Sequence, residues 1–181
     1  MGATLCYLAL GSNLGNRLAN LQDAVRMLAP SVAVDAVSNL YESEPVGPGG
    51  RAAYFNAVCA VRTALEATAL LNYVKRIEWA LGRRPGPRWG PRPADIDILI
   101  MKGVVIDNAF LTIPHPRIAE RPFVLRPLAE VAPDLDLGGG VIVGAAAEAD
   151  STQGLDRIAG PEWLYAVAVQ PSALRPDPTA L

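Results

Sequence analysis

The chain has 181 residues, of which 51% are hydrophobic and 19% are charged, and its formal net charge is −2. This length fits one domain, and this hydrophobic content excludes a wholly disordered chain. The apolar runs are strand-sized, far shorter than the roughly 18–20 residues of a membrane span, and the N-terminus lacks the basic start of a signal peptide. The sequence therefore predicts a cytoplasmic protein without a membrane segment.

The charges are distributed unevenly along the chain. Residues 1–82 carry six cations and six acids, residues 83–126 carry eight cations against four acids, and residues 127–181 carry two cations against eight acids. Seven of the eight cations in the middle segment are arginines. Because guanidinium groups bind phosphate oxygens in a bidentate manner, this clustering favours the binding of a compact polyanion.

The N-terminal part of the chain predicts a strand, a helix and a second strand. Residues 4–10 have the apolar pattern of a buried strand. Asn16 is the predicted N-cap of a helix that runs to about residue 28, with apolar side chains three and four positions apart. One strand is predicted over residues 32–41, and the side chains expected on one face of it are Val32, Val34, Ala36, Ser38 and Leu40.

The next part predicts a strand, a helix and a further strand. The strand covers residues 55–63, the amphipathic helix covers residues 65–81 and stops at Gly82, and the last strand covers residues 95–101. The order strand, helix, strand, strand, helix, strand predicts an α+β fold of the ferredoxin-like (βαββαβ) type. In such a fold the helices pack on an antiparallel sheet.

The remainder of the chain is expected to add elements around this core. A hairpin is predicted over residues 104–113 and a helix over residues 124–131. We expect one domain over residues 1–170. The three prolines of residues 171–181 predict a disordered tail.

Two aspartates in the last predicted strand of the core give the strongest chemical signal. Because strand side chains alternate, Asp95 and Asp97 are expected on one face, and Ile96, Ile98 and Ile100 on the other. Neighbouring carboxylates suit Mg²⁺, which proteins hold through one or two carboxylates together with substrate phosphates. A solvated strand face is the alternative, but the arginines immediately upstream favour a metal–phosphate site.

Several further residues allow more than one interpretation. His115, the only histidine, is either a donor to phosphate or a surface turn residue. Tyr54 and Asn56 share one strand face while Phe55 faces the core, and this pair indicates either ordinary strand packing or an aromatic plate and an amide for a flat heterocycle. Phe123 allows the same two interpretations, packing or an aromatic plate.

Two other features are interpreted as structural. Cys6 and Cys59 lie in apolar strand-like runs, which indicates buried free thiols in a reducing compartment. Residues 11–17 are rich in glycine and asparagine but lack the endings of a Walker loop or of a dinucleotide-binding loop. This segment therefore predicts a tight turn and a helix cap.

Four segments together resemble a known family. They are residues 7–15 (YLALGSNLG), residues 41–47 (YESEPVG) with 54–56 (YFN), residues 88–97 (RWGPRPADID), and residues 113–115 (IPH) with 121–123 (RPF). In this order they resemble the 6-hydroxymethyl-7,8-dihydropterin pyrophosphokinase family of folate biosynthesis. The resemblance implies the transfer of pyrophosphate from ATP to 6-hydroxymethyl-7,8-dihydropterin, giving AMP and the pterin diphosphate.

The resemblance also implies a role for individual residues. The implied catalytic residues are Arg83, Arg92, Asp95, Asp97 and His115, and the two aspartates are the implied ligands of two Mg²⁺ ions. The implied pterin-binding residues are Ser43, Val46, Tyr54, Asn56 and Phe123. The implied ATP-binding residues are Glu78, Arg88, Trp89, Arg92, Ile98, Thr112, His115 and Arg121.

The sequence departs from the family in one loop. Pro85 stands where the family commonly has a further arginine, and Arg84 stands one residue early. The expected partners are ATP and the pterin, without nucleic acid or membrane, and the expected state is a monomer. A nucleic-acid-binding module is an alternative, but Asp95 and Asp97 would repel a phosphate backbone unless metal intervened. An inactive binding homologue is a third hypothesis.

Overall fold

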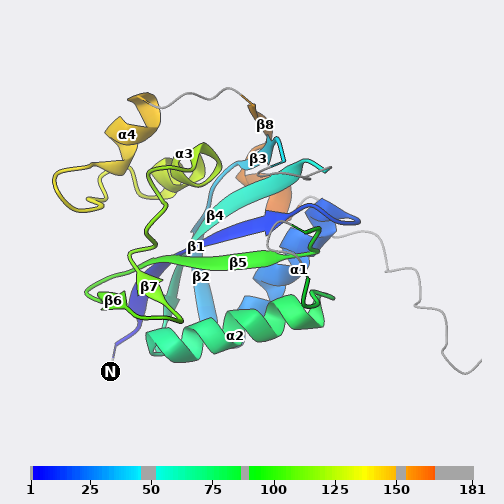
Figure 1. The fold of residues 1–181 in the computed structure, drawn as a ribbon, viewed down its shortest axis with the longest axis horizontal. Helices are drawn as coiled ribbons and strands as arrows, with labels where there is room; N and C mark the ends of the chain where they lie inside the picture. The colour runs from blue at the N-terminus through cyan, green and yellow to red at the C-terminus, as the bar shows by residue number, and fades with distance from the viewer. Residues whose placement is uncertain (1, 46–51, 87–89, 150–153, 166–181) are drawn as a thin grey trace, which may run out of the picture.

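The protein is described here by a computed structural model that covers residues 2–45, 52–86, 90–149 and 154–165. A six-stranded antiparallel sheet forms its centre, with the strand order β5-β1-β4-β3-β8 and with β2 paired to β4 beside this path (Figure 1). The strands are β1 (Thr4–Ser12), β2 (Val32–Val37), β3 (Leu40–Ser43), β4 (Tyr54–Thr63), β5 (Asp95–Met101) and β8 (Leu155–Ala159). The predicted α+β class with an antiparallel sheet is confirmed.

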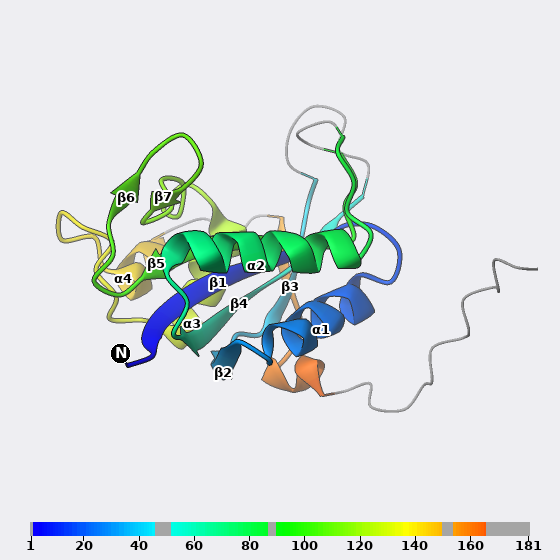
Figure 2. The same ribbon diagram turned by 90° about the horizontal axis from the view of Figure 1, so that it is seen from below.

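Helices cover both faces of this sheet. On one face lie α1 (Arg17–Leu28) and α2 (Ala67–Ala80), and on the other lie α3 (Pro122–Val131) and α4 (Val143–Ala149) (Figures 1 and 2). Each face has its own apolar cluster, because strand side chains alternate between the two sides. The remaining elements are a hairpin of β6 (Ile106–Asp107) and β7 (Thr112–Ile113) and a short 3-10 helix, η1 (Pro161–Leu164).

Two predicted helix termini are confirmed, the N-cap of α1 at Asn16 and the stop of α2 at Gly82, whereas α2 starts at Ala67 instead of residue 65 and α3 at Pro122 instead of residue 124. The side chain of Asn16 accepts a hydrogen bond from the backbone N–H of Ala19 at 3.1 Å, as an N-cap does. Gly82 follows α2 with φ = +99°, a conformation that glycine adopts without the steric cost of a side chain. Within the described ranges, no helix combines the length and the apolarity that a membrane span needs.

The single strand predicted over residues 32–41 is wrong, because the segment forms β2 and β3 with a break between them. At the break the hydroxyl of Ser38 accepts a hydrogen bond from the backbone of Val58, so a side chain replaces a backbone partner there. The register of β2 on β4 also shifts between Val34 and Ala36, and Ala36 is exposed instead of facing the core.

The predicted placement of Ile100 is also wrong. Ile96 and Ile98 pack in the cluster beneath α1 and α2, but Leu99 and Ile100 both pack in the cluster beneath α3 and α4. The reason is a register shift between β1 and β5, which changes the alternation of side chains after Ile98. The predicted tail, residues 171–181, lies outside the described residues.

Candidate functional site

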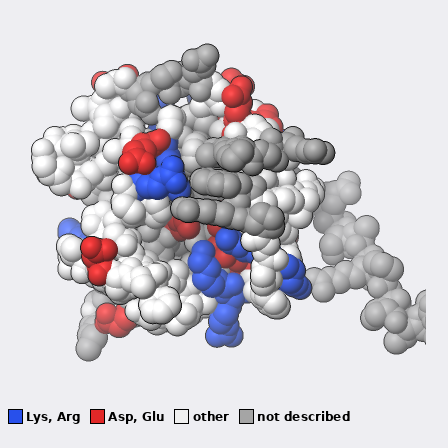
Figure 3. Space-filling model, in the orientation of Figure 1, with Lys and Arg blue, Asp and Glu red and all other residues white. Residues whose placement is uncertain are grey.

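A cavity of about 340 Å³ lies where β4, β5 and the start of α3 meet. Its lining brings together ten of the side chains predicted from the sequence, which are Ser43, Tyr54, Asn56, Arg83, Arg92, Asp95, Asp97, His115, Arg121 and Phe123. These residues are spread over about 80 positions of the sequence, so the fold assembles them. In the space-filling view, basic side chains gather around acidic atoms near the middle of this face (Figure 3).

Asp95 is held by two arginines. Arg83 donates to one carboxylate oxygen, and Nη1 of Arg92 lies 3.1 Å from the other. Burial alone would raise the pKa of Asp95, but the positive charges of Arg83, Arg92 and Lys75 outweigh it, and the pKa lies below its ordinary value. Asp95 is therefore a charged carboxylate, as a metal ligand has to be.

Glu78 lies beneath these arginines and is only 2% exposed. One of its oxygens accepts from Nζ of Lys75 at 2.8 Å and from the backbone N–H of Ile96 at 2.7 Å, and the other lies 2.8 Å from Nη1 of Arg83. Since a buried carboxylate needs such partners, Glu78 joins α2 to β5 and fixes the position of Arg83.

The turn between β1 and α1 fixes Arg92. The side-chain oxygen of Asn13 accepts from the backbone N–H of Arg92 at 2.7 Å, and the backbone N–H of Asn13 donates to the carbonyl of Arg92 at 3.2 Å. The prediction of a turn and a cap for residues 11–17 is confirmed. The same turn also holds the backbone of an arginine that lines the cavity.

His115 owes its place to the irregularity in β5. Its backbone N–H donates to the carbonyl of Leu99 at 2.7 Å, beside the register shift. Its Nδ1 accepts from the backbone N–H of Arg117 at 3.2 Å, which leaves the proton of the neutral ring on Nε2. Burial lowers the pKa of His115, Asp97 opposes this effect, and Arg121 and Arg117 add to it, with a net lowering.

The rest of the cavity is formed by an aromatic and amide surface. The Nδ2 of Asn56 donates to Oγ of Ser43 at 2.9 Å, and both side chains are buried. Tyr54 and Phe123 line the same cavity, as well as a smaller adjoining cavity of about 70 Å³ above Gly11. Phe55 packs on the opposite side, in the cluster of α1 and α2, so the predicted alternation of residues 54–56 is confirmed.

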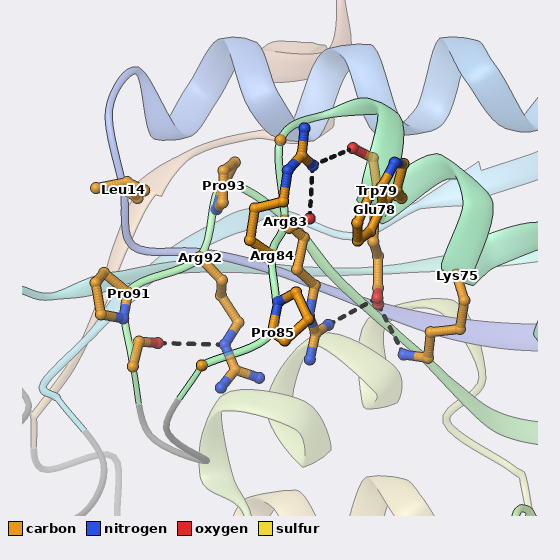
Figure 4. A pocket seen from close by; sticks show the side chains of 13 residues that line it. Leu14, Lys75, Glu78, Trp79, Arg83, Arg84, Pro85, Pro91, Arg92 and Pro93 are labelled. Carbon is orange, nitrogen blue, oxygen red and sulfur yellow. Dashed lines mark hydrogen bonds and ion pairs between the residues drawn. The ribbon is translucent and has the colours of Figure 1, made fainter.

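A second cavity, of about 680 Å³, shares lining residues with the first, and Figure 4 shows the side chains that line it. Lys75, Arg83 and Arg92 line both cavities and form the wall between them. On the far side of this wall the guanidinium of Arg84 lies 4.3 Å from the ring centre of Trp79 and donates to the carbonyl of Trp79 at 3.0 Å. Arg84 therefore caps the end of α2 instead of lining the cavity that contains Asp95.

The remaining predicted site residues lie elsewhere. Glu78 lines the second cavity, Ile98 is buried in the core, and Thr112 lies on β7 with its hydroxyl 3.4 Å from Asp107. The predicted residues Val46, Arg88 and Trp89 lie outside the described residues. Three side chains of the first cavity were missed by the sequence analysis, namely Lys75, Arg117 and Glu120. The position of Lys75 three residues before Glu78 on a helix could have predicted their ion pair and hence the place of Lys75 near the site.

The fold and this cavity define a class of protein: an α+β protein that surrounds two carboxylates with arginines, next to an aromatic surface. Such a site is suited to a polyphosphate and a flat ring held side by side. The family described as 7,8-dihydro-6-hydroxymethylpterin-pyrophosphokinase (HPPK) matches residues 7–133. The chain belongs to this family.

Relatives of known name agree with this assignment. A 2-amino-4-hydroxy-6-hydroxymethyldihydropteridine pyrophosphokinase of Methylorubrum extorquens is 43% identical over 157 residues, which cover 86% of this chain and 99% of the relative. The protein of the same name from Bacillus subtilis is 42% identical over 134 residues, which cover 73% of this chain and 80% of the relative.

Solved structures share the fold. A Plasmodium falciparum HPPK-DHPS triple mutant with SDX-DHP superposes with a TM-score of 0.69 at 16% identity, covering 81% of this chain and 44% of that chain. The same triple mutant with pterin and p-hydrobenzoate superposes with a TM-score of 0.67 at 14% identity, covering 86% of this chain and 48% of that chain. This chain therefore spans less than half the length of those two chains.

Proposed function

We propose that the chain is a 2-amino-4-hydroxy-6-hydroxymethyl-7,8-dihydropteridine diphosphokinase. In this reaction the hydroxymethyl oxygen of the pterin attacks the β-phosphorus of ATP, an O–P bond forms and the hydroxyl proton is released to solvent. The bond between the β-phosphorus and the α–β bridging oxygen breaks, and AMP leaves with that oxygen. The observation that carries the proposal is that one cavity brings two aspartates, four arginines and His115 beside Tyr54, Asn56 and Phe123. Relatives at 42–43% identity bear the name of this enzyme.

The pterin is proposed to lie between Tyr54 and Phe123. Aromatic faces attract a flat heterocycle over a large contact area, and both side chains line the cavity. Asn56 offers an amide that donates and accepts, and Ser43 holds that amide through their 2.9 Å hydrogen bond. Because the pair is buried, an unmatched ring edge would leave a polar group without a partner, which favours a heterocycle of complementary pattern.

The phosphates of ATP are proposed to lie at the arginine side of the cavity. Arg83, Arg92 and Arg121 supply fixed positive charge, and Nε2–H of His115 supplies a neutral donor. Phosphoryl transfer needs alignment of the attacking and leaving oxygens and neutralisation of charge, without a covalent enzyme intermediate. Glu78 holds the side chain of Arg83, and hydrogen bonds to Asn13 and Leu99 hold the backbones of Arg92 and His115, so these residues are positioned before substrate binds.

We also propose that Asp95 and Asp97 hold Mg²⁺, as two ions. The donor chemistry fits, because both side chains are hard oxygen ligands on one strand face and line one cavity. Both carboxylates face arginines here, Arg121 lying 3.7 Å from Asp97. These arginines would transfer to phosphate oxygens when ATP and metal bind together. Bound Mg²⁺ neutralises phosphate charge and polarises the phosphorus that is attacked.

We further propose a ferredoxin-like topology, a single domain over residues 1–170, a cytoplasmic location and a monomeric state. A ferredoxin-like core is supported by the order β5-β1-β4 with β2 beside β4, and by α1 and α2 on one face. One domain is supported by strand β8, which joins the late part of the chain to the central sheet. The two buried free cysteines suit a reducing compartment such as the cytoplasm. A monomer remains the proposed state.

The experiment that tests the proposal is a product assay. The purified chain is incubated with ATP, MgCl₂ and 6-hydroxymethyl-7,8-dihydropterin, and nucleotides are separated by chromatography. We expect AMP and the pterin diphosphate in equal amounts, with neither formed when the pterin or Mg²⁺ is left out. ADP as the product, or AMP without the pterin, would contradict the proposal.

A further inference from the structure

Arg17, the first residue of α1, contacts one residue of β3, one residue of β4 and the residue that precedes β4. Its Nη1 lies 2.6 Å from a carboxylate oxygen of Glu42 and donates to the carbonyl of Ala53 at 2.8 Å. Its guanidinium also lies 3.9 Å from the ring centre of Phe55, as in a cation–π contact. The side chain of Arg17 thus makes an ion pair, a hydrogen bond to a backbone carbonyl and a cation–π contact.

The position of Arg17 is unfavourable for the helix itself. The N-terminus of a helix carries partial positive charge, so a cation in the first turn is destabilising there. The side chains of Arg17 and Glu42 are only 26% and 33% exposed, less than those of most surface ion pairs of this protein. The contribution of Arg17 therefore lies in its tertiary contacts.

These contacts lie directly behind the pterin-facing side chains. In the pairing of β3 with β4, Glu42 is opposite Phe55, and Ser43 is opposite Tyr54. Because strand side chains alternate, the first pair points to the face of α1, and the second pair points into the cavity on the other face. Arg17 thus holds the residues adjacent to both members of the cavity pair.

We propose that Arg17 is a positioning residue for the pterin. Resting on the proposed function, the inference is that Arg17 fixes the ends of β3 and β4 from behind, so that Tyr54 and Ser43 stand ready before the pterin binds. Without this clamp the ends of the two strands are held by fewer contacts, and the competent arrangement is only one of several. Binding then requires that this arrangement be selected, which reduces the apparent affinity.

Loss of Arg17 should affect the binding of the pterin and not that of the nucleotide, because residues other than Arg17 hold the arginines proposed to bind phosphate. Arg83 is held by Glu78 and Asp95, and the backbone of Arg92 is held by Asn13. None of these contacts includes Arg17. Loss of the clamp should therefore weaken the binding of the pterin and leave the binding of Mg–ATP nearly unchanged.

The test compares Arg17→Ala with wild type and with Arg62→Ala. Arg62 is a matched control, because it pairs with Asp35 at 2.7 Å on the same sheet and is remote from the cavity lining. The probes are 6-hydroxymethylpterin, followed by its fluorescence, and Mg²⁺ with α,β-methylene-ATP, followed by calorimetry. For Arg17→Ala we expect the pterin Kd to rise about tenfold, as when the competent fraction falls to about one tenth.

The nucleotide Kd should change less than about twofold in both variants, and Arg62→Ala should retain the pterin affinity of wild type. In steady-state assays of Arg17→Ala, KM for the pterin should rise while kcat at saturating pterin stays within about twofold, because binding has lost preorganisation and the reacting groups are intact. If Arg17→Ala does not fold, Glu42→Gln serves the same comparison. It keeps the size of the side chain, removes the charge, and should raise the pterin Kd about threefold, since part of the clamp remains.

The experiment distinguishes a failure of the Arg17 proposal from a failure of the proposed function. If wild type binds the pterin and Arg17→Ala, or Glu42→Gln in its place, binds it equally well, the clamp is refuted and the proposed function stands. An equal loss of pterin and nucleotide affinity also refutes it, because that result indicates a general loss of structure. If wild type does not bind the pterin, the proposed function fails first, and the clamp falls with it.

Discussion

The two aspartates of the cavity differ in how firmly they are held. Asp95 contacts Arg83 and Arg92, whereas Asp97 lies 3.7 Å from Arg121, which is a long ion pair. The charge of Asp97 should therefore matter less to the folded protein than that of Asp95. This difference makes it the better residue for separating function from stability.

We predict that Asp97→Asn lowers kcat by about 100- to 1,000-fold, the size of effect seen when one electrostatic contact to a transition state is removed. The melting temperature should stay close to that of wild type, because the 3.7 Å ion pair contributes less than about 1 kcal/mol. Turnover is measured by AMP formation over a range of Mg²⁺ concentrations. A near-normal rate with an ordinary Mg²⁺ dependence would show that Asp97 is not a metal ligand.

Glu78 should be important for stability. Glu78→Ala leaves the backbone N–H of Ile96 without its acceptor and removes the buried partner of Arg83. We expect the free energy of unfolding to fall by about 3 kcal/mol, typical of one partner lost from a buried charged pair. Urea unfolding measures it, with Glu66→Ala as the control. Glu66 is the exposed N-cap residue of the same helix, and its side chain makes no cap hydrogen bond, so a similar loss there would contradict the argument.

At the scale of elements, the late part of the chain is tied to the early part. The indole N–H of Trp163 in η1 donates to the carbonyl of Ser38 at 2.9 Å, and its own carbonyl accepts from Gln22 of α1 at 2.6 Å. The side chain is only 1% exposed and belongs to the core beneath α1. Together with β8, which pairs with β3, this segment completes one end of the sheet.

Trp163→Ala should therefore be strongly destabilising. We expect a loss of about 3–5 kcal/mol in the free energy of unfolding, because a large buried side chain leaves a cavity and the Ser38 carbonyl loses its donor. Thermal and urea unfolding measure the change. Deletion of residues 171–181 is the comparison, and its three prolines predict almost no change in melting temperature. If the deletion lowered the free energy of unfolding more than Trp163→Ala does, the conclusion that Trp163 stabilises the fold and the tail does not would be wrong.

On the scale of the whole molecule, the proposed binding site depends on parts from all over the fold. Tyr54 starts β4, Asp97 lies on β5, Phe123 lies in the first turn of α3, and Arg92 is held by the turn after β1. A ligand that contacts all of these parts stabilises the folded state as a whole, since none of the parts stays together after unfolding.

We predict that Mg–ATP at a hundred times its Kd raises the free energy of unfolding by about 2.7 kcal/mol. For a chain of this size that corresponds to roughly 5–10 °C in melting temperature. EDTA should abolish most of the shift, because Asp95 and Asp97 repel the phosphates of ATP when no metal ion lies between them. Differential scanning fluorimetry with ATP, with and without EDTA, measures it. An equal shift in EDTA would contradict metal-assisted binding.

The sequence by itself determined the elements whose signals are local. The 3.6-residue periodicity and the caps gave α1 and α2, and strand alternation placed Asp95 and Asp97 on one face and Tyr54 and Asn56 together. These predictions succeeded because helix and strand periods are set by neighbours within a few residues.

Only the tertiary structure decided the break at Ser38, the reversed side of Ile100 and the anchoring of His115 on Leu99. Each depends on which strand lies alongside and in which register, and that partner is tens of residues away in the sequence. The sequence also did not indicate that Glu78 is a buried ion-pair partner or that Arg17 contacts β3 and β4, because charged residues on a helix usually lie at the surface. Only the packing of a helix against a distant strand shows that one is buried and that the other holds the strand pair behind the cavity.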